Sequence, residues 1–256
     1  MIEVAALDGM GLGLSVDFLP PGYRAWPGWA MTQAAFAALK FDDDAGRDGC
    51  FSYWTRGLNG GELACALTHL ATWARSAARA SAGEEVYNTI IFEDDAQTST
   101  FTASAVLKLL TELRNSGVAF DILRLGRSDA DVRGLVLTRE EDAKEVHNFK
   151  YQQRAKRKTA TVIDDVGSWT GAYGLSARAV QLLANSGFGQ DLLNVDDFLY
   201  CCSSVDHPRK DLYNAPPVKY VRDHGALTAL TVTMDTQVEF LGITMTVASQ
   251  KSDCGG

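Results

Sequence analysis

Residues 86–97 read VYNTIIFEDDAQ, an apolar run that ends in three consecutive acidic residues. The length and β-branched content of 86–92 predict a buried strand. In an extended chain, residues two apart share a face, so we expect Glu93 and Asp95 to converge while Asp94 turns away. Two converging carboxylates need a cation or a shared proton between them. The stretch therefore predicts a site for a hard divalent ion, Mg²⁺ or Mn²⁺, with capping of a following helix as the alternative.

Helices and strands alternate along much of the chain. Segment 59–80 has apolar residues at helical spacing behind a capping pattern, in which Glu62 follows Asn59 by three residues. The other predicted elements are a helix over 101–114, strands over 120–125 and 171–175, and a helix that begins at Ser176 and stops before Gly187. This alternation predicts an α/β fold with a mostly parallel central sheet flanked by helices. Ligands of such sheets gather beyond the carboxyl ends of the strands, where the three acids fall.

Three regions depart from this pattern within what we expect to be a single domain over 1–256. Residues 1–50 are rich in Gly and Pro and are predicted to be irregular around one short helix near 31–39. Residues 126–160 are polar and are predicted to form a helix-bearing surface excursion. Residues 220–256 contain β-rich segments and a frayed end.

Composition excludes several classes of protein. The net charge of −8 argues against a nucleic-acid partner, and the local basic run over 150–158 is interpreted as a solvated loop, with contact to a phosphate as the alternative. Five cysteines without a CxxC pair indicate neither a zinc knuckle nor a disulfide framework. The sequence shows no transmembrane run and no signal peptide, which predicts a soluble, cytoplasmic protein, or one of the endoplasmic reticulum lumen if the N-terminus is truncated.

Five blocks resemble, in order and spacing, those of glycosyltransferase family 25, which includes procollagen galactosyltransferases and bacterial lipopolysaccharide glycosyltransferases. The blocks are RGLNGGELACALTHLATW, the strand that ends in EDD, FDILRLG, SWTGAYGLSARAVQLL and NVDDFLYCCSSVDHP. The resemblance spans residues 3–207 and implies a nucleotide-sugar glycosyltransferase fold of the GT-A type. The family's opening strand, I-N-L-x-x-R, is absent from the sequence, which predicts an unfilled slot in the sheet, and residues 220–256 diverge from the family.

The resemblance also implies roles for individual residues. Glu93 and Asp95 would hold Mn²⁺ or Mg²⁺ and the diphosphate of a UDP-sugar donor. Asp196 and Asp197 are the candidates for the base that deprotonates an acceptor hydroxyl in an inverting transfer, with capping of a helix as the alternative. The residues expected to contact the substrates are Glu62, His69, Asp94, Trp169, Thr170 and Tyr173.

Alternatives remain open for several of these residues and for the function. His69 can instead be a buried, hydrogen-bonded histidine, Tyr173 a core residue and Glu62 a capping residue. The expected function is transfer of a hexose, galactose in the first instance, from a UDP-sugar to a hydroxyl of a protein, as in procollagen hydroxylysine galactosylation. The alternatives are a lipopolysaccharide or polysaccharide transferase with a glycan acceptor, and a non-catalytic module that binds a sugar or nucleotide.

Overall fold

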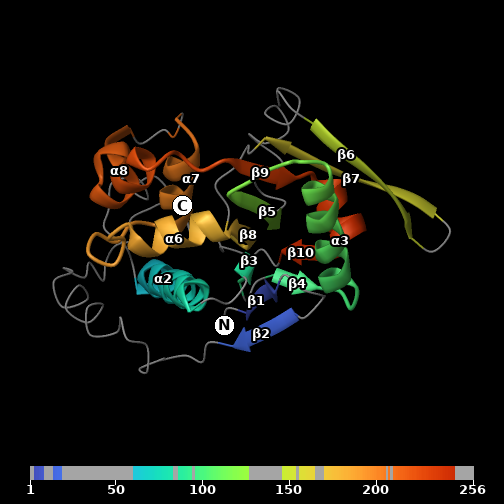
Figure 1. The fold of residues 1–256 in the computed structure, drawn as a ribbon, viewed down its shortest axis with the longest axis horizontal. Helices are drawn as coiled ribbons and strands as arrows, with labels where there is room; N and C mark the ends of the chain where they lie inside the picture. The colour runs from blue at the N-terminus through green and yellow to red at the C-terminus, as the bar shows by residue number, and fades with distance from the viewer. Residues whose placement is uncertain are drawn as a thin grey trace, which may run out of the picture.

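An eight-stranded sheet forms the centre of the computed structural model (Figure 1), in the order β2-β1-β3-β8-β5-β9-β7-β6. The structure describes residues 3–8, 14–18, 60–82, 86–93, 96–126, 146–153, 156–164, 170–205, 207 and 210–245. The strands of this sheet are β1 (Glu3–Asp8), β2 (Leu14–Phe18), β3 (Val86–Phe92), β5 (Ile122–Gly126), β6 (Val146–Gln153), β7 (Lys156–Asp164), β8 (Ala172–Ser176) and β9 (Ala229–Val232). A two-stranded sheet pairs β4 (Ala96–Thr98) with β10 (Ile243–Met245).

Helices cover both faces of the central sheet. They are α2 (Gly60–Ser81), α3 (Thr102–Asn115), α6 (Ala177–Asn185), α7 (Val195–Ser203) and α8 (Pro216–Asp223), with a 3₁₀ turn over Lys210–Asn214 and a π-helical turn over Thr236–Leu241. In Figure 1, α3 lies on one side of the strands, and α2, α6 and α7 lie on the other. Within the described ranges, no helix combines the length and the apolar character that crossing a membrane requires.

The mixed α/β class is confirmed, whereas the mostly parallel sheet is wrong. Strands β3, β5 and β9 run in the same direction, but β8 lies between β3 and β5 and runs antiparallel to both. Among the described strands, β5 and β9 are the one parallel neighbouring pair. Alternation of helices and strands predicts the direction of β3 and β5 correctly, because α3 connects them as a crossover. It does not predict that a later strand inserts between them.

The N-terminal part and the excursion also differ from the sequence-based predictions. Two short runs within 1–50 are strands, and β1 pairs with both β2 and β3, so the described part of the sheet has no empty slot beside β3. Residues 146–164 form the antiparallel hairpin of β6 and β7, and β7 joins the sheet through β9, while residues 127–145 of the predicted helix-bearing excursion lie outside the described residues. The polar composition of 146–164 suggested surface structure without a strand, but an antiparallel pair such as β6 and β7 can form from strands in which most residues are polar. The short helix predicted near 31–39 lies outside the described residues.

Alternation along the strands divides the core into two clusters. On β3, Ile90 faces the cluster under α3 and Ile91 faces the cluster under α2, α6 and α7. On β5, Leu123 and Leu125 face α3 while Ile122 faces α6 and α7. The next residue on that second face of β5 is therefore a charged one, Arg124, which is also buried.

Local signals place the helices as the sequence predicts. Ser176 caps α6, and its hydroxyl accepts a hydrogen bond from the backbone N–H of Ala179 at 3.0 Å. The chain leaves α6 through Gly187, whose φ of 78° is accessible to glycine with little strain. Strand β3 has the predicted bounds, and α2 and α3 lie where the apolar periodicity places them. In the C-terminal part, β9 and β10 are strands of four and three residues, and the π-helical turn lies between them.

Candidate active site

Polar residues gather at one end of three neighbouring strands, where β3 and β5 end and β8 begins. Glu93 follows the last residue of β3, and its backbone N–H donates to the carbonyl of Gly171 just before β8. Tyr173 lies near the start of β8, and Arg124 lies opposite it on β5. Because β8 runs antiparallel to β3 and β5, its first residues meet the last residues of its two neighbours. All three side chains lie on the face that carries α2 and α7.

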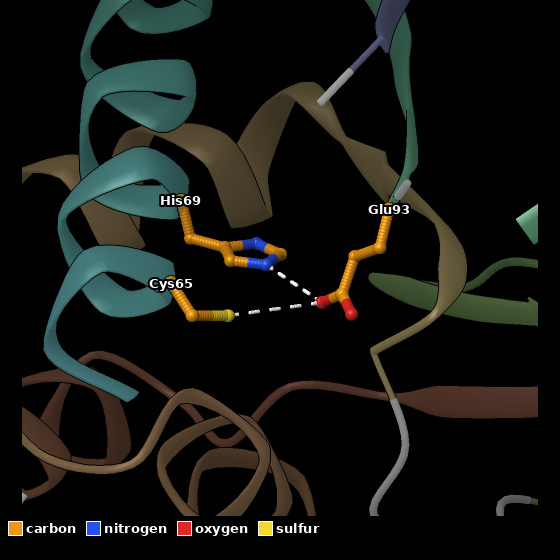
Figure 2. Close-up of side chains that lie close together, drawn as sticks. All are labelled: Cys65, His69 and Glu93. Carbon is orange, nitrogen blue, oxygen red and sulfur yellow. Dashed lines mark hydrogen bonds and ion pairs between the residues drawn. The ribbon is translucent and has the colours of Figure 1, made fainter. Parts of the chain in front are cut away.

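Helix α2 presents a row of functional side chains to this edge. Cys65, His69 and Trp73 are four residues apart, so they lie one above another on the same helix face. Figure 2 shows Cys65 and His69 pointing from α2 toward Glu93. The His69 Nε2 lies 2.9 Å from the Glu93 Oε1, and the Cys65 Sγ lies 4.0 Å from the same oxygen. Helix periodicity thus brings a thiol and an imidazole to one carboxylate.

His69 is fully buried and bonded at both ring nitrogens. Its Nδ1 lies 2.6 Å from the hydroxyl oxygen of Tyr173, which also accepts a hydrogen bond from the Trp73 indole N–H at 3.2 Å. Burial raises the pKa of the Tyr173 phenol well above its ordinary value, although the bond from Trp73 lowers it, so the hydroxyl keeps its proton. His69 and Tyr173 therefore reach the site through Glu93 rather than through an exposed surface of their own.

Helix α7 begins at the site with two adjacent aspartates. The cap is Asn194, whose side-chain oxygen accepts hydrogen bonds from the backbone N–H groups of Asp196 and Asp197. The capping alternative for the two aspartates is therefore wrong, and both lie in the first turn, where the helix dipole favours negative charge. Asp197 is buried, and its Oδ1 lies 3.1 Å from the Nε2 of the buried His207.

Asp196 differs from its neighbour. The residue as a whole is half-buried, but its Oδ1 is out of contact with solvent and has no hydrogen-bond partner. Desolvation by burial, followed by the nearby charge of Glu93, raises the pKa of Asp196 to about 7. A hydrogen bond from Thr170 and the charge of Arg124 act in the opposite direction. A carboxylate in this state is half-ionised near neutral pH and can accept a proton.

Cys65, His69 and Glu93 can also supply ligands to a metal ion, because their donor atoms lie within 4.8 Å of one another. A sulfur, a nitrogen and an oxygen donor together suit a borderline-soft ion such as Zn²⁺. Carboxylate oxygens alone suit Mg²⁺ or Mn²⁺. Glu93 fits either set, with a side chain 20 % exposed.

The remaining sequence-predicted residues have these positions. Glu62 lies in the first turn of α2 and is half-buried. Thr170 is buried beside Asp196. Asp94, Asp95 and Trp169 lie outside the described residues, as does Asn59, the predicted cap of α2. Most of the basic run lies on the hairpin of β6 and β7, where Lys158 pairs with Tyr151 and Lys156 with Gln153.

Sequence analysis missed two residues of this group. Arg124 stood unnoticed in the strand FDILRLG, although a charged residue within a buried strand signals a polar partner. Cys65 falls where helical periodicity predicts the core, although its spacing of four from His69 places both on one helix face. In each case the signal was one polar residue at a position where periodicity predicted the core.

Comparisons with known proteins agree on one family. The sequence profile of "Glycosyltransferase family 25 (LPS biosynthesis protein)" matches residues 50–199. The chain is 24% identical over 172 residues to procollagen galactosyltransferase 1 of Danio rerio, covering 67% of this chain and 23% of the relative. It is 25% identical over 147 residues to procollagen galactosyltransferase 2 of Mus musculus, covering 57% of this chain and 20% of the relative.

The chain thus spans about a quarter or less of the length of these curated relatives. No solved structure gives a significant match. The matched range 50–199 includes α2, β3, β5, β8, α6 and the first residues of α7, and it contains Cys65, His69, Glu93 and Asp196. The protein belongs to glycosyltransferase family 25.

Proposed function

We propose that this protein is a divalent-metal-dependent, inverting glycosyltransferase that moves a hexose, galactose in the first instance, from a UDP-sugar to a hydroxyl group. Membership of family 25 and the names of the two relatives support transfer of a sugar. We further propose that the sheet with β8 inserted between β3 and β5 is a fold of the GT-A type.

The observation that carries the proposal is the state of Asp196. One of its carboxylate oxygens is buried without a hydrogen-bond partner, beside the Glu93 carboxylate. Such an arrangement lowers the stability of the fold, because a buried polar atom without a partner loses its hydrogen bonds to water and gains none in the protein. A general base must keep an oxygen available for the incoming proton. With a pKa of about 7, Asp196 has the proton affinity that base catalysis near neutral pH requires.

Asp197 is better explained by structure. Its Oδ1 is bonded to His207, and the ring of His207 also packs against Tyr200. The backbone N–H of His207 donates in turn to the Tyr213 hydroxyl at 2.9 Å. This pair ties α7 to the segment that follows it. Of the two aspartates that sequence analysis left open, we therefore assign the base to Asp196.

The reaction then needs four changes that balance. The acceptor hydroxyl gives its proton to the free oxygen of Asp196. The acceptor oxygen forms a bond to the anomeric carbon as the bond from that carbon to the diphosphate oxygen breaks. The bonding electrons leave with UDP, and the configuration at the anomeric carbon inverts. Thr170, bonded to Asp196, orients the carboxylate for the acceptor.

The donor side of the proposal rests on Glu93. Glu93 and Asp95 would hold Mn²⁺ or Mg²⁺, since two carboxylates match the oxygen ligands that these ions prefer. When bound, such an ion supplies Lewis-acid neutralisation of the departing diphosphate. We propose that Glu62, Asp94 and Trp169 contact the substrates, while the buried His69 and Tyr173 act through Glu93.

The acceptor is the least constrained part of the proposal. The names of the relatives favour a hydroxyl on a protein, and the family description, an LPS biosynthesis protein, supports a glycan acceptor as the second candidate. A non-catalytic module that binds a sugar nucleotide is the third. The raised pKa of Asp196 favours an enzyme over a binding module, because binding alone requires no free base.

The decisive experiment measures release of UDP from UDP-galactose and other UDP-sugars, with Mn²⁺ or with a chelator, first in water and then with hydroxylysine peptides or glycans. We expect metal-dependent release in the wild type and a fall of about 10²- to 10⁴-fold in Asp196→Asn. Asp197→Asn is the matched control, with a much smaller change per folded molecule. Equal losses in the two variants would reject Asp196 as the base. A folded wild type that binds a UDP-sugar without turnover would leave only the binding module.

A further inference from the structure

A continuous chain of hydrogen bonds leads from the core of the protein to Glu93. Trp73 lies at its inner end, 3.2 Å from the Tyr173 oxygen, which lies 2.6 Å from the His69 Nδ1. The His69 Nε2 then lies 2.9 Å from the Glu93 Oε1. The phenol and imidazole rings are nearly parallel, with an interplanar angle of 19° and centroids 5.6 Å apart. Every link except the Glu93 carboxylate is fully buried, so water does not compete for these bonds.

The direction of the chain follows from its inner end. An indole N–H can only donate, so the Tyr173 oxygen accepts from Trp73. The Tyr173 hydroxyl keeps its own proton, since burial raises its pKa, and the acceptor beside it is the His69 Nδ1. In neutral imidazole one nitrogen accepts and the other donates. His69 Nε2 therefore carries the ring proton and donates it to the Glu93 carboxylate.

The opposite tautomer is unfavourable at this position. It would place an N–H of His69 against the Tyr173 oxygen, and the phenol proton would lose its bond to Nδ1 in a buried place. Leaving a buried donor unbonded typically costs about 1–3 kcal/mol. The indole of Trp73 thus selects the tautomer of a histidine that it does not bond directly.

We propose that Tyr173 is a positioning residue of the donor site, which holds the Glu93 carboxylate in place by fixing the tautomer of His69. The inference deepens the proposed function and rests on it. The relay, the chain of hydrogen bonds from Trp73 through Tyr173 and His69, ends at the Glu93 carboxylate, which would serve the metal and the diphosphate. Partners of this kind behind a ligating group typically contribute about 10- to 100-fold in metal affinity or activity.

The same relay decides how the cluster of Cys65, His69 and Glu93 is used. A metal ligand needs the lone pair of Nε2, but the relay puts a proton on that nitrogen. His69 is therefore a hydrogen-bond donor to Glu93 rather than a ligand. Of the cluster, Glu93 alone would bind an ion that prefers oxygen ligands. Binding of a softer ion by the Cys65 sulfur and the His69 nitrogen would contradict the proposal.

The first test reads the tautomer in the full chain and needs no substrate. Long-range proton–nitrogen NMR of ¹⁵N-histidine protein distinguishes the two tautomers, and His69→Gln identifies the signal among four histidines. We expect the Nε2–H form in the wild type, and in Tyr173→Phe an Nδ1 resonance that shifts because this nitrogen loses the hydrogen bond it accepts from Tyr173. Tyr220→Phe, on α8 beside His224, is the matched control and should leave the signal unchanged. An Nδ1–H form in the wild type, a measurement that requires no variant to fold, would overturn the proposal.

The second test measures the Mn²⁺ concentration that gives half-maximal UDP release. We expect Tyr173→Phe to raise it about tenfold in the wild-type background. In a His69→Gln background the same substitution should have no further effect, because an amide N–H₂ donates to Glu93 without a tautomer to be selected. Equal effects in both backgrounds would reduce Tyr173 to a core residue and overturn the proposal.

A titration with Co²⁺ alone completes the test. The relay predicts no sulfur-to-cobalt charge-transfer band, and a band that Cys65→Ser removes would overturn it in favour of a metal site on the cluster. The tautomer and the Co²⁺ spectrum are independent of turnover. If no UDP-sugar is consumed while the tautomer is as expected, the proposed function fails and the relay stands as a structural device.

Discussion

The two faces of the central sheet are built from the same strands and differ in what they bury. Under α3 the core cluster is apolar, with Leu109, Leu113 and Leu125 fully inaccessible to solvent, and the buried Thr102 and Thr236 beside it are hydrogen-bonded to the backbone. Under α2 and α7, apolar packing gives way at one edge to buried or half-buried polar side chains, among them Arg124 and Glu93. Burying polar groups costs free energy unless each finds a partner. The α3 face thus stabilises the fold, while the opposite face gives up stability at the place where chemistry is expected.

The comparison predicts its largest effect on the apolar face. Leu109→Ala should lower the free energy of unfolding by about 2–5 kcal/mol, because it removes a fully buried side chain and leaves a cavity. Turnover per folded molecule should stay at the wild-type level, since α3 contributes no residue to the site. Urea unfolding and UDP-sugar turnover well below the midpoint measure the two quantities. Lys108→Ala, on the exposed side of the same helix, is the control, and a fall in turnover in Leu109→Ala beyond that of the control would break the division between the faces.

How far the sequence predicts this division depends on the range of the interaction. The cap at Ser176, the strand before Glu93 and the helix that carries His69 depend on residues within a few positions, and these are confirmed. The position of β8 between β3 and β5 depends on pairing between distant segments, for which periodicity holds no information. The polar composition of 146–164 concealed a hairpin for the same reason.

The site follows the same rule. Glu93, His69 and the pair of aspartates could be selected from motifs, because their spacing is local. The proposed assignment of the base to Asp196 rather than Asp197 could not be made from motifs. It depends on His207, ten positions after Asp197, and on Arg124 from another strand. Hydrogen-bond partners at long range decide which of two adjacent carboxylates is satisfied, and that information appears only in the folded chain.

The second prediction concerns stability on the polar face. The pKa of Asp196 is raised to about 7 in the fold from an ordinary 3.8, so between these values the folded chain binds more protons than the unfolded chain. Stability contributed by the protonated form is therefore present at low pH and is lost as pH rises through about 7. Asp196→Asn removes the penalty, and at pH 8 we expect it to raise the free energy of unfolding by roughly 2–4 kcal/mol.

Asp197→Asn provides the contrast, because it breaks a buried pair with His207 and should lower the free energy of unfolding at the same pH. Denaturant unfolding of both variants between pH 5 and 8 checks the opposite signs. If Asp196→Asn destabilises the protein as Asp197→Asn does, then Asp196 is a structural residue, and burial of its carboxylate does not lower the stability of the fold.

The smallest effect concerns Arg124, whose charge lowers the pKa of Asp196 while burial and Glu93 raise it. In the wild type, kcat/KM for a UDP-sugar should fall below about pH 7 as Asp196 becomes protonated. Arg124→Met should move this acid limb to higher pH, by roughly one unit or less, and Arg124→Lys, which retains a charge, should move it less. A limb that stays in place in Arg124→Met would mean that burial and Glu93 suffice to set the proton affinity of Asp196. The polar face would then hold one perturbed carboxylate, rather than a group of charges balanced against one another.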